Sequence, residues 1–85
     1  MNLRDTYNKI AKDWNDDHDK DTWWTDGTNK FCSYLEKGSK ILDVGCASGI
    51  KSEYLMNKGF DVTGIDLSEK MIEMARERNT NGLFI

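Results

Sequence analysis

The second half of the chain alternates between two patterns of apolar residues, and this alternation limits the folds open to it. Short strand-like segments occur at residues 41–44, 61–66 and 83–85. Between them, residues 50–58 and 69–78 place apolar side chains at helical spacing. Strands that alternate with helices in this way form a parallel sheet. We therefore predict an α/β fold for this half of the chain.

Residues 1–39 precede this alternation and have a different pattern. Apolar side chains recur at spacings of three and four, which predicts a helix over residues 3–14. The polar, strongly acidic run at residues 15–21 interrupts it, and a second helix is predicted over residues 28–37. We therefore expect two units: an N-terminal helical lid or cap, and then the first part of an α/β domain over residues 40–85.

The predicted sheet is too small to be stable alone. The chain has 85 residues, and only two or three parallel strands fit into it. Parallel sheets need cover on both faces and protected edges. We therefore expect that the sheet is completed either by the remainder of a longer chain or by partner chains in an oligomer.

Charge and composition give no support for several kinds of partner. Acidic residues outnumber basic ones by 15 to 12 and the basic residues are dispersed, so nothing predicts a nucleic-acid surface. No apolar run approaches the ~20 residues that cross a bilayer, so no membrane partner is expected. Two cysteines without a CxxC pair and no apolar leader predict a reducing, cytoplasmic setting. No metal is expected, because the acidic run lacks the glycine and glutamate of a calcium loop and His18 is the only histidine.

A loop of small residues follows the first predicted strand. Asp43 lies near the end of that strand, and Gly45, Ala47 and Gly49 come after it at every second position. Ligands of open parallel sheets bind at this end of the strands, and glycine lets a ligand approach the backbone. Exposed N–H groups at the start of the next helix favour a negatively charged group. Asp66 ends the second strand at the distance where an acidic residue accepts hydrogen bonds from a ribose. The pattern predicts a nucleoside site.

The loop also discriminates between nucleosides. A pyrophosphate cofactor favours GxGxxG, and here Ile50 fills the position of the third glycine. The carboxylate of Asp43 would repel a pyrophosphate, but it suits a ligand that carries an ammonium group. S-adenosylmethionine (SAM) has such a group, so we favour SAM over NAD. Two alternatives stay open: a non-catalytic nucleoside-binding or interaction module, and a truncated NAD-dependent oxidoreductase.

The segments DVGCASG, VTGIDLS and EKMIEMAR resemble the class I SAM-dependent methyltransferases over residues 40–78. The family's glycine motif matches at Asp43, Gly45 and Gly49, and Ala47 replaces the middle glycine. The resemblance implies a Rossmann-like, three-layer fold whose seven-stranded sheet is incomplete here. It also implies transfer of a methyl group from SAM to an acceptor that the sequence does not identify. YNKIAKDW, at residues 7–14, is similar to the lid helices of members that act on small molecules.

The resemblance further implies a role for each site residue. The Gly45–Gly49 loop, with Cys46 and Ala47, lines the methionine and ribose, and Asp43 faces the amino group. Asp66 binds the ribose hydroxyls. Leu67 and Met71 pack on the adenine, and Tyr7 covers the cofactor. No catalytic base is assigned.

Several of these residues also have a purely structural interpretation. Asp66 can cap the helix that starts after Ser68, and Leu67 and Met71 can belong to the core. Tyr7 can belong to the packing face of its helix, as can Trp14. Cys46 fits its position by its small size. The adjacent tryptophans at 23 and 24 can shape an acceptor pocket, or one can be packed and the other partly exposed.

Overall fold

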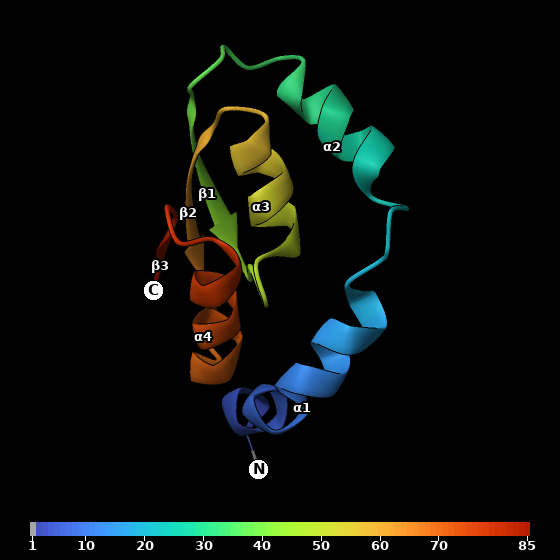
Figure 1. The fold of residues 1–85 in the computed structure, drawn as a ribbon, viewed down its shortest axis with the longest axis vertical. Coiled ribbons are helices and arrows are strands. Elements are labelled where there is room, and N and C mark those ends of the chain that lie inside the picture. Colours follow the sequence, from blue (N-terminus) through green and yellow to red (C-terminus); the bar gives the residue numbers. More distant parts are fainter. Residues whose placement is uncertain (1) are drawn as a thin grey trace.

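The computed structural model describes residues 2–85 and arranges them as four helices and three strands (Figure 1). In chain order these are α1 (Leu3–His18), α2 (Thr25–Cys32), β1 (Lys40–Val44), α3 (Ile50–Asn57), β2 (Asp61–Ile65), α4 (Glu69–Arg78) and β3 (Leu83–Phe84). The predicted alternation of strands and helices from residue 40 onward is confirmed. Each predicted strand is present, and the side chain of Ser68 caps α4 by accepting a hydrogen bond from the backbone N–H of Met71.

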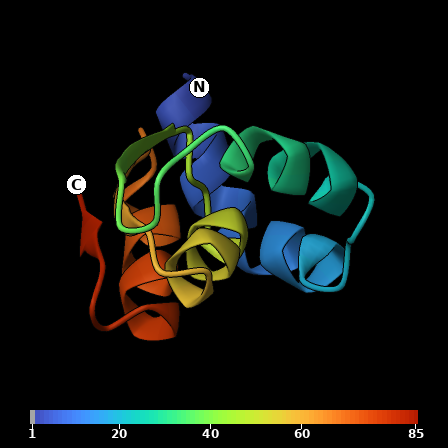
Figure 2. The same cartoon turned by 90° about the horizontal axis from the view of Figure 1, so that it is seen from above.

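The three strands are parallel and lie in the order β1-β2-β3. Ile41 pairs with Val62, and Gly64 pairs with both Asp43 and Phe84. These paired residues face the same side of the sheet, because side chains alternate along a strand. Helices α3 and α4 pack on this side, as the view from above shows (Figure 2).

The two faces of the sheet differ in burial. On the face that α3 and α4 cover, Val62 and Phe84 are only 3% and 2% exposed. On the other face, Leu42, Val44 and Leu83 are 60%, 71% and 59% exposed. The apolar run at residues 41–44 is typical of a strand buried on both faces, but here Leu42 and Val44 are exposed. Within residues 2–85, no element covers the second face.

Both N-terminal helices differ from their predicted bounds. Helix α1 continues to His18, four residues beyond Trp14, and Lys12 and Asp16 form an ion pair of 2.8 Å one turn apart on it. The acidic run at residues 15–21 therefore does not end the helix at residue 14, as the sequence predicted. Helix α2 begins at Thr25 and ends at Cys32, earlier than predicted at both ends. Beyond it, backbone bonds to the carbonyl three residues back replace the α-helical ones, as from Leu35 N to Cys32 O at 3.0 Å.

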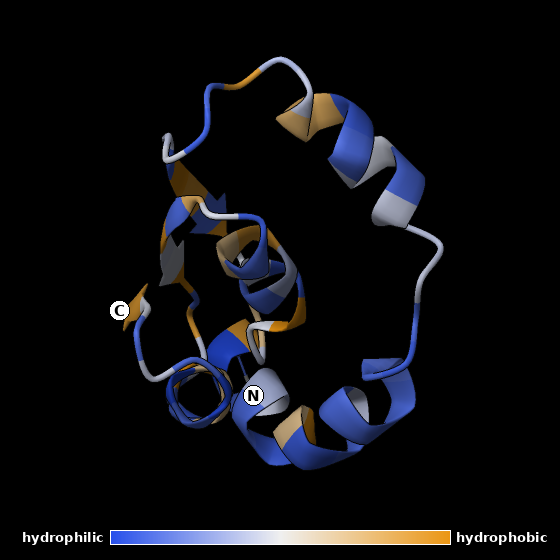
Figure 3. Ribbon diagram, turned by 45° about the horizontal axis from the view of Figure 1, so that its top comes forward, coloured by the Kyte–Doolittle hydropathy of each residue, from blue (hydrophilic) through white to orange (hydrophobic). Residues whose placement is uncertain are grey.

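Helix α1 docks on α4 mainly through polar contacts. Near the start of α4, the Asn8 side chain accepts hydrogen bonds from the hydroxyl of Ser68 and from the backbone of Lys70. At its end, the Arg78 guanidinium donates to Asn15 and Asp19 at 2.9 and 2.8 Å. Figure 3 shows how little of α1 is hydrophobic, and Ala11 is its one buried residue. Among residues 2–85, no helix has the length and apolar composition needed to cross a membrane.

Substitution by alanine should have opposite effects on stability at Gly64, in the contact between β2 and β3, and at Gly27, in α2. A Cβ at Gly64 would lie 2.6 Å from the Phe84 ring, so Gly64→Ala should destabilise the fold by about 1–3 kcal/mol through overpacking. A Cβ at Gly27, in α2, meets nothing within 4 Å. Gly27→Ala should therefore stabilise by up to about 1 kcal/mol through helix propensity. Urea unfolding of both variants checks this, and a neutral Gly64→Ala would contradict the packing described here.

Candidate functional site

The loop between β1 and α3 is fastened to the end of β2. The backbone N–H groups of Gly45 and Cys46 both donate to the carbonyl of Ile65, at 2.8 and 2.9 Å. The next N–H, of Ala47, donates to the carboxylate of Asp66 at 2.9 Å. Three consecutive N–H groups of the loop are thus already used within the protein. They are not available to an anionic ligand. The exposed donors predicted from the sequence are a different set, at the start of α3.

Asp66 connects the loop to α4. Its second carboxylate oxygen accepts a hydrogen bond of 2.9 Å from the backbone of Ser68, the residue that caps α4. Asp66 therefore has the structural role that the sequence offered as an alternative. The side chain is still partly exposed, and a carboxylate offers about four acceptor positions, of which these two bonds use two. It can accept further hydrogen bonds from a ligand.

Asp43 is held by α3. The hydroxyl of Ser52, which is fully buried, donates to Oδ2 of Asp43 at 2.7 Å. This bond fixes the carboxylate on the side of the sheet that carries the helices, beside the loop. No motif of the sequence points to Ser52, although it lies in the first turn of the helix that follows the loop.

The three small residues of the loop have different environments. Gly45 has φ +71°, and a Cβ there would have nothing within 4 Å, so the backbone is open to a ligand. Ala47 is the only non-glycine residue with positive φ in the described part of the chain, at 51°. A Cβ at Gly49 would lie 3.1 Å from the backbone of Ala75. Gly49 thus allows α4 to pack closely against the loop.

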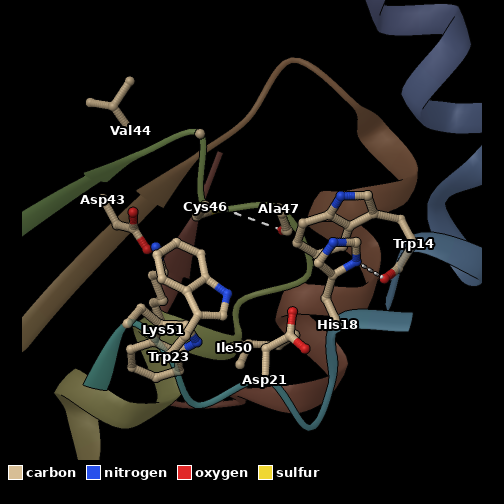
Figure 4. A pocket seen from close by; sticks show the side chains of 12 residues that line it. Trp14, His18, Asp21, Trp23, Asp43, Val44, Cys46, Ala47, Ile50 and Lys51 are labelled. Carbon is tan, nitrogen blue, oxygen red and sulfur yellow. Dashed lines mark hydrogen bonds between the residues drawn. The ribbon is translucent and has the colours of Figure 1, made fainter. Parts of the chain in front are cut away.

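Two pockets lie against this loop. The first has a volume of about 230 Å³ and is shown in Figure 4. It is lined by Trp14, His18, Asp21, Trp23, Trp24, Asp43, Val44, Gly45, Cys46, Ala47, Ile50 and Lys51. The second has a volume of about 280 Å³ and is lined by Leu3, Tyr7, Trp14, Gly45, Ala47, Asp66, Leu67 and Met71. Every site residue predicted from the sequence except Gly49 lines at least one of them.

The residues shared by the two pockets are Trp14, Gly45 and Ala47. The loop therefore forms a common wall, with Asp43 on one side and Asp66 on the other. Trp14 has the spacing of the packing face of its helix, and in the structure it lines both pockets. His18, Asp21 and Lys51 also line the first pocket, and no motif pointed to them. The fold brings His18 and Asp21 to the loop, whereas Lys51 follows the loop directly, in the first turn of α3.

Cys46 belongs to the core and also lines the first pocket. It is buried together with Ile72, Ala75 and Phe84. Burial, and to a smaller extent the charges of Asp43 and Asp66, raise the pKa of its thiol to about 12. The thiol stays protonated near neutral pH, which agrees with the interpretation that Cys46 is present for its size.

Residues 41–84 match the family model described as "Methyltransferase domain", and the chain belongs to this family. Two similar relatives are ubiquinone biosynthesis O-methyltransferases. The one from Bordetella avium is 55% identical over 40 residues, and the one from Azoarcus sp. is 47% identical over 53. These matches cover 47% and 62% of this chain but only 17% and 21% of the relatives, so the chain spans about a fifth of their length.

Solved structures agree with the predicted fold. A TehB-like SAM-dependent methyltransferase from Corynebacterium glutamicum superposes with a TM-score of 0.73 at 26% identity, over 91% of this chain and 42% of its own. The plantazolicin methyltransferase BpumL, solved with a pentazolic desmethylPZN analogue and SAH, superposes with a TM-score of 0.66 at 31% identity, over 91% of this chain and 32% of its own. The prediction of an incomplete Rossmann-like methyltransferase fold is confirmed.

The two cysteines should differ in reactivity. At pH 8, iodoacetamide should modify the partly exposed Cys32 and leave Cys46 unmodified until the protein unfolds, because a pKa of about 12 leaves little thiolate. The raised pKa also means that this thiol's contribution to stability is present below pH 9 and is lost as the pH rises from 9 towards 12. Mass spectrometry of the alkylated protein checks the reactivity, and equal rates at both thiols would contradict the burial of Cys46.

Proposed function

We propose that the protein is a SAM-dependent methyltransferase and that this chain carries its cofactor-binding part. The observation that carries the proposal is the pattern of donors and acceptors at the loop. Three loop N–H groups are consumed by Ile65 and Asp66, while the carboxylates of Asp43 and Asp66 flank the two pockets. This arrangement disfavours the pyrophosphate of NAD and suits a nucleoside that carries positive charge. Membership of the methyltransferase domain family supports the same choice.

The residues of the two pockets fit the parts of SAM. In the second pocket, Asp66 would accept hydrogen bonds from the ribose, with Leu67 and Met71 against the adenine and Tyr7 covering it. In the first, Asp43 would face the ammonium group. Between them, the open backbone at Gly45 allows close approach. When bound, SAM supplies an activated methyl group, and the task of these residues is to hold it in a fixed orientation.

The surroundings of the site suggest how the rest of the protein contributes. Residues 1–39 would form a lid, because α1 places Tyr7 and Trp14 over the loop. The open face of the sheet would be covered by further chain or by an oligomeric partner. The acceptor would be a small molecule, since the first pocket is small and enclosed partly by side chains of this lid. The two free cysteines support a cytoplasmic location.

Calorimetric titration of S-adenosylhomocysteine (SAH) into the protein tests the cofactor site. Asp66→Asn should weaken binding at least ten-fold, because a hydrogen bond to a charged group contributes about 1.5–3 kcal/mol and 1.4 kcal/mol is one decade. Asp61→Asn is the matched control. It removes the same charge from the exposed opposite end of β2 and should leave binding unchanged. Absence of SAH binding by the folded protein, or equal binding by both variants, would refute the proposal.

A further inference from the structure

The first pocket contains one permanently charged basic side chain. Lys51 is the only lysine or arginine among the residues that line it. It lies in the first turn of α3, directly after the loop. Figure 4 shows Lys51 on the same side of the pocket as Asp43 and Trp23, away from Trp14 and His18. The cavity therefore has a cationic and an anionic group on its wall.

The ammonium group of Lys51 is positioned by two indole rings. It lies 5.5 Å from the centroid of the Trp23 ring and 5.8 Å from that of the Trp24 ring. The Trp24 ring is itself packed edge-on against Tyr54, with centroids 5.1 Å apart. Cation–π contacts orient an ammonium group but leave its charge in place. Lys51 is thus held at the pocket with a charge that can still bind an anion.

The opposite charges of the pocket do not neutralise each other. Neither Lys51 nor Asp43 forms an ion pair within residues 2–85, and the Asp43 carboxylate accepts a hydrogen bond from Ser52 instead. Gly49 supplies no capping side chain to α3, so the positive end of the helix dipole adds to the charge of Lys51. Two unpaired charges of opposite sign in one cavity are complementary to a zwitterionic group.

From these contacts we propose that Lys51 binds the carboxylate of the methionine end of SAM, while Asp43 faces the ammonium group of the same end. An amino acid carries both charges on one carbon atom, so both partners must border one small space. The first pocket, of about 230 Å³, meets this requirement. The inference rests on the proposed function and adds to it a residue that determines specificity. Lys51 would distinguish SAM and SAH from adenosyl compounds that lack the carboxylate.

Calorimetric titration of SAH and of decarboxylated SAH tests this assignment. The second compound keeps the adenosine, the sulfur and the amine, and a hydrogen replaces its carboxylate. Lys51→Gln should weaken SAH binding by about five-fold, the upper range for an ion pair that stays in contact with water. It should not weaken the binding of decarboxylated SAH. Lys51→Arg keeps the positive charge and should keep most of the affinity for SAH.

Lys58→Gln is the matched control. Lys58 lies at the other end of α3, and its ammonium also contacts an aromatic ring, 5.0 Å from the centroid of Tyr54. It lines neither of the two pockets at the loop. The variant removes the same charge from the same helix and should leave the affinity for both compounds unchanged.

Three results would overturn the inference. Equal affinity of Lys51→Gln and Lys58→Gln for SAH would mean that Lys51 does not bind the cofactor. Equal losses for SAH and decarboxylated SAH in Lys51→Gln would mean that the lysine acts on the shape of the pocket and not on the carboxylate. In both cases SAH binding by the unchanged protein would leave the proposed function standing. If the unchanged protein binds neither compound, the proposed function fails and this inference fails with it.

Discussion

The end of β2 holds the loop that follows β1, and the candidate site depends on this attachment. The carbonyl of Ile65 and the carboxylate of Asp66 together accept three consecutive N–H groups of the loop. The same carboxylate bonds to the start of α4. One acidic residue therefore fixes the relative positions of the loop, the sheet and a helix. Both pockets are formed against the loop in this fixed position.

The elements that could be predicted from the sequence are those whose local residue pattern agrees with the tertiary fold. The strands from residue 40 onward, the cap at Ser68 and the position of Asp66 all follow from periodicity and spacing. The burial of β1 did not, because it depends on which elements pack against the strand, and within residues 2–85 none covers its second face. Leu42 and Val44 have the composition of a doubly buried strand, yet they face an uncovered side.

The site was predictable in its cofactor half and much less so in the rest. Asp43, Gly45 and Asp66 belong to one contiguous pattern whose spacing has a physical meaning. His18 reaches the first pocket only because α1 lies across the end of the sheet, and no sequence spacing relates it to the loop. Hydrogen bonding within the loop was also beyond prediction, since it requires knowing which acceptor each N–H group meets.

The polar docking of α1 has a consequence for how the chain opens. Helix α1 buries one residue, Ala11, and is otherwise attached to α4 by the hydrogen bonds of Asn8 and Arg78. Contacts of this kind contribute far less than a shared apolar core, so α1 forms a unit of lower local stability than the sheet. Because Trp14 on this helix borders both pockets, separation of α1 would expose both at once, and ligands in the two pockets would be energetically coupled through its docking.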